Sequence, residues 1–292
     1  MELGDSCWWD YSANWLINCR KVDRSCDNCF AVKKAATVLA HDPLYRGRTK
    51  RLKDGRWAWH GPPGVLPPGH RSWTLPLKIR PAPERKLGPG MPALVALNLM
   101  GDTFYEKHSD ADIDRGLMTV AASENIGLLL TRRPQRMVAY FLALERQLSP
   151  EALRRWQAHL WLGVSCGHQE EFNKYWPLLR QLALRGWTTF LSLAPLIDEI
   201  VLSDDCLALV KWVIVSGEKA AHKHCRYMKP AWARALLAQC RAAGIPFFMK
   251  IMSRDEHIPL DLLVRQFPVS IKQSSNKQSS RDRKNQGCLG LC

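Results

Sequence analysis

The stretch Ala93-Leu-Val-Ala-Leu-Asn-Leu99 is an apolar run that is interrupted only by an asparagine near its end. Similar runs recur along the chain, at Ile126–Thr131, Leu160–Ser165, Thr188–Leu193, Trp212–Ser216 and Phe247–Ile251. Strands without alternating polar residues are typical of parallel sheets, because helices cover both faces of such sheets. These runs therefore predict the buried strands of one parallel sheet.

Helical segments separate the predicted strands. The pattern predicts helices at Asp112–Ser123, from the region of Arg136 to about Leu148, at Gln169–Arg185 and at Pro230–Ala243. A repeated alternation of strand and helix specifies an α/β fold. About seven such units fit a partial or nearly closed TIM-like (βα) barrel, in which chemistry gathers at the carboxyl ends of the strands.

Three cysteines stand near the N-terminus with the spacing C-x6-C-x2-C, at Cys19, Cys26 and Cys29. An extended segment at residues 7–18 precedes them, and a predicted helix at Phe30–Leu39 follows. Three thiolates suit an iron–sulfur cluster with one iron left open. They also suit zinc with a fourth ligand from elsewhere, for which His222 or His224 is available.

Polar residues mark the carboxyl ends of the predicted strands. They are Asn98, Asp102, Thr131, Arg132, Ser165, Ser192, Glu218 and Lys250. In a barrel-like sheet these side chains and the three cysteines face one cavity. Each residue taken singly is equally consistent with an ordinary hydrogen bond or ion pair at the barrel mouth.

The predicted barrel spans residues 1–268 and contains an irregular insertion at about 42–92 that is rich in proline and is expected to include one short hairpin. A basic tail at 269–292 is low in apolar residues and is predicted to be disordered. The net charge is +15. Residues 44–86 hold eleven Lys and Arg against two acids, a net of +9, and residues 271–286 hold five against one, a net of +4.

This localised positive charge indicates a polyanionic partner, with nucleic acid the first candidate. Tryptophans at positions 57, 59 and 73 lie among the basic residues of the insertion, where they could stack on bases. The alternative is a solvated basic loop whose tryptophans pin it to the protein body.

The composition is that of a soluble globular protein, with 46% apolar and 24% charged residues. We expect a cytoplasmic location, because the chain shows neither a signal peptide nor an apolar run of membrane-spanning length. In a reducing cytoplasm the ten cysteines are not expected to form disulfides.

A set of sequence blocks resembles a phage-associated, radical-SAM-like protein family over about residues 8–268. The blocks lie at Trp15–Cys29, Leu128–Met137, Trp161–Ser165, Phe190–Leu196, Trp212–Glu218 and Cys240–Lys250. The spacing departs from the usual C-x3-C-x2-C of the radical SAM superfamily. The chain also reads Asn98-Leu-Met-Gly-Asp-Thr-Phe104 where the family pattern is Asn-Ser-Met-Ser-Asp-Leu-Phe, and Ser216-Gly217 where a glycine pair is expected.

The resemblance implies a [4Fe-4S] cluster held by Cys19, Cys26 and Cys29, whose fourth iron binds S-adenosylmethionine. Reduction would then yield a 5′-deoxyadenosyl radical that abstracts hydrogen from the substrate. The residues expected to bind the cofactor are Asn98, Asp102, Thr131, Arg132 (or Arg133) and Ser165. Glu218 and Lys250 are the expected catalytic or substrate-positioning residues. An external donor such as flavodoxin or ferredoxin would supply the electron.

The resemblance further implies modification of a nucleic-acid base, with thymidine hypermodification in phage DNA as the leading hypothesis. The reaction would move an amino-acid adduct such as glycine from nitrogen to carbon attachment, in the cytoplasm of the phage's host. Three alternatives stay open: DNA repair of the spore photoproduct lyase type, a radical SAM reaction on a peptide or small metabolite, and a non-catalytic zinc protein that binds nucleic acid.

Overall fold

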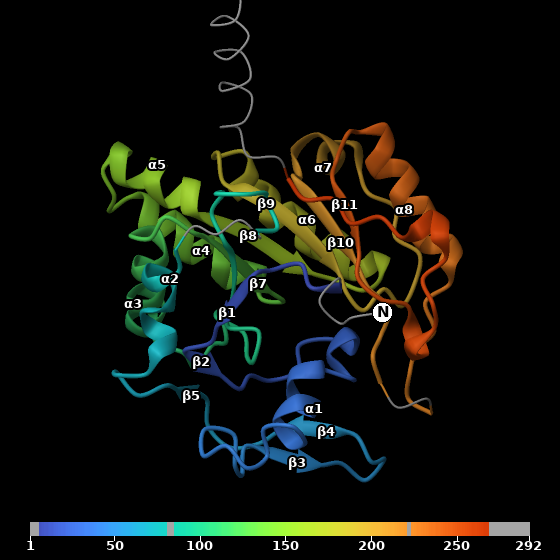
Figure 1. Cartoon of the computed structure of the whole chain (residues 1–292), viewed down its shortest axis with the longest axis horizontal. Helices are drawn as coiled ribbons and strands as arrows, with labels where there is room; N and C mark the ends of the chain where they lie inside the picture. Colours follow the sequence, from blue (N-terminus) through green and yellow to red (C-terminus); the bar gives the residue numbers. More distant parts are fainter. Residues whose placement is uncertain (1–5, 81–84, 221–222, 269–292) are drawn as a thin grey trace, which may run out of the picture.

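The computed structural model describes residues 6–80, 85–220 and 223–268, so the predicted tail at 269–292 lies outside the described residues. Seven parallel strands form one sheet: β1 (Tyr11–Ala13), β6 (Leu94–Leu97), β7 (Ile126–Thr131), β8 (Leu160–Ser165), β9 (Thr188–Leu193), β10 (Trp212–Val215) and β11 (Phe247–Met249). The strands lie side by side in that order, and the sheet curls into a half-barrel (Figure 1). The predicted α/β class with a curled parallel sheet is therefore confirmed.

The helices that cover the sheet come from the segments between strands. They are α3 (Asp110–Ala121), α4 (Pro134–Glu145), α5 (Pro150–His159), α6 (Gln169–Ala183), α7 (Asp204–Leu209) and α8 (Pro230–Ala242). Neither α5 nor α7 was predicted from the sequence. The α5 helix begins where the Ser149 side chain accepts a hydrogen bond from the Ala152 amide and Pro150 occupies the first turn.

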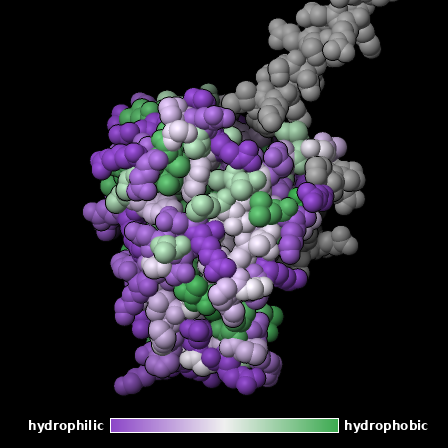
Figure 2. Space-filling view, turned by 90° about the vertical axis from the view of Figure 1, so that its left-hand side faces the viewer, coloured by the Kyte–Doolittle hydropathy of each residue, from purple (hydrophilic) through white to green (hydrophobic). Residues whose placement is uncertain are grey.

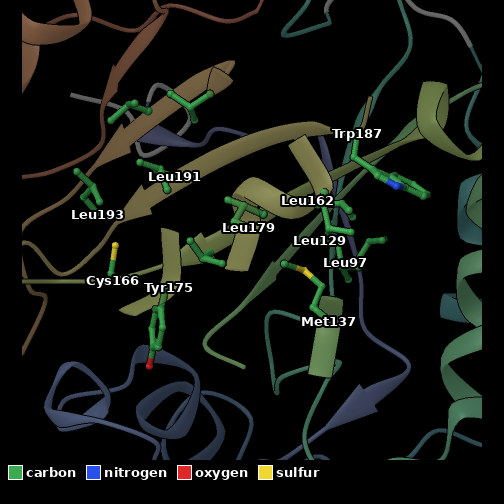
Figure 3. Packing of buried hydrophobic residues seen from close by; sticks show 14 of the residues in the cluster. Leu97, Leu129, Met137, Leu162, Cys166, Tyr175, Leu179, Trp187, Leu191 and Leu193 are labelled. Carbon is green, nitrogen blue, oxygen red and sulfur yellow. The ribbon is translucent and has the colours of Figure 1, made fainter. Parts of the chain in front are cut away.

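The two faces of the sheet are both apolar, as the unbroken apolar runs require. On the convex face, Leu97, Leu129 and Leu162 pack against helix residues such as Met137 of α4 and Leu179 of α6 (Figure 3). On the concave face, a second cluster contains Trp161, Phe190, Trp212 and Phe248. This aromatic cluster fills the inside of the half-barrel beneath the carboxyl ends of the strands.

A small N-terminal layer lies below the sheet in Figure 1. Its elements are β2 (Leu16–Ile17), the short 3-10 turn Arg24–Cys26, α1 (Phe30–Ala36), β3 (Thr49–Arg51), β4 (Trp57–Trp59) and β5 (Gly64–Val65). The turn Arg71–Trp73 and α2 (Leu75–Lys78) follow this layer, and α2 lies beside α3 (Figure 1). The β3 and β4 strands form the antiparallel hairpin expected inside the insertion. Tyr45 and Trp59 of the insertion pack into a separate small core with Ile17, residues of α1 and Met100, which follows β6. Two further turns, Ser253–Asp255 and Leu260–Leu262, follow β11.

The face shown in Figure 2 is mainly hydrophilic, and its hydrophobic residues form small separate groups. Among the helices of the described residues, none has the length and apolar content that crossing a bilayer requires.

Candidate functional site at the carboxyl edge of the half-barrel

A cavity of about 360 Å³ opens at the carboxyl edge of the sheet. Its lining includes all three cysteines of the N-terminal cluster. It also includes every strand-end residue that the sequence singled out, namely Asn98, Asp102, Thr131, Arg132, Ser165, Ser192, Glu218 and Lys250. The parallel topology brings these residues together, because each parallel strand ends at the same edge.

The three cysteines lie on one short loop between β2 and α1. Cys26 ends a 3-10 turn, and Cys29 is the N-cap residue of α1, with its amide donating to the Cys26 carbonyl at 3.3 Å. Burial raises the pKa of the Cys19 thiol well above its ordinary value, and the nearby Cys29 raises it further. Burial also raises the pKa of Cys26. The surrounding protein therefore favours the thiol form of these two groups, whereas a bound metal would favour the thiolate form.

The three cysteine thiols are the side chains that would hold either an iron–sulfur cluster or zinc at this cavity. Within residues 6–80, 85–220 and 223–268, no three His, Cys, Asp or Glu side chains converge closely enough to hold one metal ion. A [4Fe-4S] cluster places each thiolate on a different iron, so its three sulfur ligands surround a volume rather than a point. Three thiols lining one cavity match that requirement in number and in chemistry.

The zinc alternative rests on His224. This residue and Cys29 both line a smaller cavity of about 130 Å³ beside the first. The His224 Nε2 atom is buried without a hydrogen-bond partner in the described part of the chain. The other candidate, His222, lies outside the described residues.

A buried charged network holds the cysteine loop from the side of α6. The Ser25 hydroxyl lies 2.8 and 2.7 Å from the two carboxylate oxygens of Glu171, and the Gly167 amide donates to Glu171 at 2.7 Å. The Tyr175 hydroxyl donates to Asp23 at 2.8 Å. Figure 3 shows this hydroxyl pointing away from the leucines of the core, toward the N-terminal layer. Helix α6 thus holds the loop at two points.

Arg132 joins the same network. Its Nη1 atom lies 3.4 Å from carboxylate oxygens of both Asp23 and Glu171, and its Nη2 donates to the Ala194 carbonyl at 2.9 Å. The side chain is largely buried, as are those of its two acidic partners. The guanidinium predicted to bind a cofactor carboxylate is therefore already paired within the protein.

Asp102 is likewise saturated by protein donors. Its two oxygens accept from the Thr131 hydroxyl at 2.7 Å, the Phe104 amide at 3.0 Å and the Arg132 amide at 3.1 Å. The Arg133 guanidinium adds a fourth contact at 3.2 Å and reaches the Arg20 carbonyl at 2.8 Å. Asp102 and Arg133 therefore tie β7 to the start of the cysteine loop.

Glu218 secures the other end of that loop. Its carboxylate accepts from the Asn28 side chain at 2.8 Å and from the Arg226 amide at 2.8 Å. It also forms a close ion pair with the Arg226 guanidinium, whose Nη1 donates to the Arg24 carbonyl at 2.6 Å. The residue expected to be catalytic is thus buried and fully engaged in positioning residues 24–28.

The remaining strand-end residues divide into two groups. Asn98 uses both ends of its amide, accepting from the Trp15 and Leu16 amides and donating to Thr103, and Ser165 donates to the Ala194 carbonyl at 3.1 Å. Ser192 and Lys250 differ from these. In the described part of the chain, neither side chain has a hydrogen bond or a salt bridge, and both line the cavity.

Sequence reasoning missed the partners that hold this site. Ser25 and Asn28 lie inside the cysteine motif, and that position is the one signal that could have marked them. Glu171 and Arg226 carry no such signal, because a helical glutamate and a loop arginine are most often solvated surface residues. Their roles depend on the close approach of segments that are far apart in the sequence.

The fold and site define an α/β half-barrel protein with a thiol-lined cavity at the carboxyl edge of its sheet. The chain belongs to the family described as "Protein of unknown function (DUF5131)", whose sequence profile it matches over residues 5–287. No curated protein and no solved structure shows significant similarity to it.

Proposed function

We propose that this protein is a radical SAM enzyme that uses a [4Fe-4S] cluster and S-adenosylmethionine to modify a nucleic-acid base. The observation that carries the proposal is the placement of Cys19, Cys26 and Cys29 on one cavity at the carboxyl edge of a parallel half-barrel. When bound, such a cluster supplies the one-electron chemistry that breaks an unactivated C–H bond. The half-barrel is, on this proposal, a partial TIM-like barrel.

The chain's own residues give the cavity its shape. Glu171 and Glu218 hold the loop through Ser25 and Asn28, one on each side of the ligand cysteine Cys26. The hydrogen-bonding groups of Asp102 and Arg132 are engaged by other residues of the protein. These two side chains therefore fix the shape of the cavity wall, and only their cavity-facing atoms can contact a cofactor. Ser192 and Lys250 are then the strand-end groups with side chains available to a ligand.

The basic hairpin β3–β4 supports a nucleic-acid substrate. Lys50, Arg51 and Lys53 are exposed on it. Arg56, which directly precedes β4, reaches Asp27 of the cysteine loop at 3.6 Å. Exposed cations attract a phosphate backbone independently of base sequence. A duplex substrate would then have to extrude its target base into the cavity.

Among reactions on a base, we propose thymidine hypermodification in phage DNA, by rearrangement of an N-linked glycyl adduct to the C-linked isomer. The expected product has the mass of the substrate and a different chromatographic retention. Incubation of the reduced protein with DNA that carries the adduct tests this. If 5′-deoxyadenosine forms while the DNA stays unchanged, the adduct-bearing DNA is not the substrate, and a different substrate is required.

The cofactor assignment is tested by anaerobic reconstitution with iron and sulfide. We expect a [4Fe-4S] signal in electron paramagnetic resonance after dithionite reduction, and 5′-deoxyadenosine when S-adenosylmethionine is added. The Cys26→Ala variant should lose the cluster, whereas Cys7→Ala, which removes a half-buried cysteine outside the loop, should keep it. A fully loaded cluster that never forms 5′-deoxyadenosine would exclude the catalytic proposal.

A second candidate is a non-catalytic nucleic-acid-binding protein with zinc on the cysteine loop. The unpartnered Nε2 of His224, which shares a cavity with Cys29, is the observation that favours it. It predicts a colourless protein that retains zinc and loses it in the His224→Ala variant. The cluster assignment predicts that His224→Ala leaves the iron content unchanged.

A further inference from the structure

Lys250 stands apart from the other charged side chains of the cavity. It follows β11 directly, and its amide donates to the Val215 carbonyl at 2.8 Å, which fixes its backbone to β10. Arg132, Arg133 and Glu218 are all paired with opposite charges, whereas no carboxylate pairs with Lys250 among the residues that the structure describes. Its ammonium group is therefore a cation in this cavity for which the described part of the fold supplies no anion.

Two aromatic rings frame this ammonium. The Lys250 Nζ atom lies 5.8 Å from the ring centroid of Trp9 and 5.8 Å from that of Phe30, both within the range of cation–π attraction. Phe30 directly follows Cys29, and Trp9 packs edge-on against the buried Trp8 at 4.9 Å between centroids. Trp9, Phe30 and Lys250 all line the cavity, so the framed ammonium faces its interior.

The rings attract a cation but leave its hydrogen-bonding capacity unused, since an ammonium has three donors and a ring face accepts weakly. Burial also lowers the pKa of Lys250; of the two nearby titratable groups, Cys7 raises this pKa and Lys219 lowers it. A bound oxyanion would stabilise the Lys250 ammonium, because it supplies both a negative charge and hydrogen-bond acceptors. The flat faces of Trp9 and Phe30 favour a planar group beside that oxyanion.

We infer that Lys250, Trp9 and Phe30 form a subsite for a planar substrate that carries an oxyanion. This deepens the proposed function, because the subsite lies in the same cavity and places the ligand beside Cys29. The oxyanion has two sources in a modified nucleic acid: a backbone phosphate, or a carboxylate on the base itself. Both present the same chemistry to the ammonium, and the experiment separates them.

The test needs neither iron nor S-adenosylmethionine turnover, so it is independent of whether the cluster assignment holds. Binding of three probes to the full-length protein is measured by calorimetry: thymidine, thymidine 5′-monophosphate and 5-carboxy-2′-deoxyuridine. In Lys250→Gln, the affinity for the probe with the correct oxyanion should fall about tenfold or more, since a charged hydrogen bond is removed. Affinity for neutral thymidine should be unchanged, and Lys250→Arg should restore binding of the anionic probe.

Lys229→Gln is the matched control. Lys229 also lies over an indole, with its Nζ 5.2 Å from the Trp232 ring centroid, but it is exposed at the start of α8 and does not line the cavity. This variant should bind all three probes as the native protein does. A loss confined to the monophosphate assigns the oxyanion to the backbone, and a loss confined to the carboxylated nucleoside assigns it to the base.

The inference is overturned if Lys250→Gln binds both anionic probes with native affinity. It is also overturned if the variant loses affinity only for S-adenosylmethionine, measured in parallel, because Lys250 would then serve the cofactor. A native far-ultraviolet circular dichroism spectrum and a native melting temperature are required of Lys250→Gln. If it fails them, Lys250→Met takes its place, since it keeps the apolar stem against the two rings.

Discussion

Ser25 and Glu171 meet across 146 residues of sequence, with the serine hydroxyl 2.7 Å from a carboxylate oxygen. Both side chains are buried, and Ser25 immediately precedes Cys26. The hydrogen bond therefore fixes the middle of the cysteine loop to helix α6. A loop that must present three sulfurs in one arrangement gains directly from such a rigid support.

Ser25→Ala should loosen the cysteine loop without unfolding the protein. A hydrogen bond to a charged group contributes about 1.5–3 kcal/mol, so the free energy of local opening at residues 19–29 should fall by about that amount. Amide hydrogen exchange followed by mass spectrometry measures it. Ser12→Ala removes an exposed hydroxyl from β1 and should leave exchange in the loop unchanged. Equal protection in both variants would mean that Ser25 does not support the loop.

Arg132→Gln should destabilise the whole protein. The substitution leaves Asp23 and Glu171 buried without their shared guanidinium, and breaking a buried ion pair costs about 3–5 kcal/mol. Urea denaturation followed by tryptophan fluorescence provides the measurement. Arg234→Gln serves as control, because its pair with Asp261 is solvent-exposed and should contribute little. Similar unfolding midpoints for the two variants would show that the buried network carries no net stability.

The sequence predicts the strands and the strand-end residues that line the cavity. It does not predict the residues that hold the cysteine loop in place. Short apolar runs such as Leu160–Ser165 that alternate with helical segments are typical of buried parallel strands, and parallel topology then aligns Ser165 with Ser192. By contrast, the sequence predicts that Arg132 and Glu218 contact ligands, whereas in the structure Arg132 pairs with Glu171 and Glu218 pairs with Arg226. The partner of a buried charge comes from a segment that only the folded chain brings close, so the local sequence pattern does not predict it.

His108 should make stability fall in mild acid. The imidazole is buried, with Nδ1 3.1 Å from the Asp102 carbonyl oxygen, and burial lowers its pKa below the ordinary value of about 6.5. The unfolded chain therefore binds a proton at a higher pH than the folded chain does. Below about pH 6.5 this difference removes stability progressively, until the pH reaches the folded-state pKa.

The measurement is the free energy of unfolding between pH 7.5 and 5, taken in steps of about half a unit across that window. His108→Gln should flatten the curve below about pH 6.5, because the titrating group is gone. His41→Gln, which changes an exposed histidine, should keep the native slope. A native slope in His108→Gln would assign the acid sensitivity to other groups.

Gly116→Ala should destabilise helix α3 although alanine is the better helix former. A Cβ atom at this position would lie 2.1 Å from the indole of Trp15, which is fully buried. Overpacking of this kind costs about 1–3 kcal/mol, against a gain of about 1 kcal/mol in helix propensity. Thermal unfolding should show a lower melting temperature for Gly116→Ala. Gly69→Ala, where nothing lies within 4 Å, should show almost no change.

Neutralising the β3–β4 hairpin should reduce the salt dependence of DNA binding. Lys50, Arg51 and Lys53 are exposed, so replacing all three by glutamine removes charge without disturbing the core. Arg48 is left in place, because its guanidinium donates to the Leu44 and Pro62 carbonyls and supports the hairpin. The slope of the logarithm of affinity against the logarithm of salt concentration should become less negative by about 0.9 for each phosphate that the variant no longer neutralises.

A triple variant of equal charge change separates this local effect from net charge. Arg154, Lys211 and Arg241 are exposed and do not line the cavity, and glutamine at all three lowers the total charge by the same amount. If the hairpin binds the phosphate backbone, the hairpin variant changes the slope and this control does not, because counterion release reflects only the phosphates neutralised in the complex. Equal slopes in the two variants would assign the binding to overall charge and leave the hairpin without a specific role.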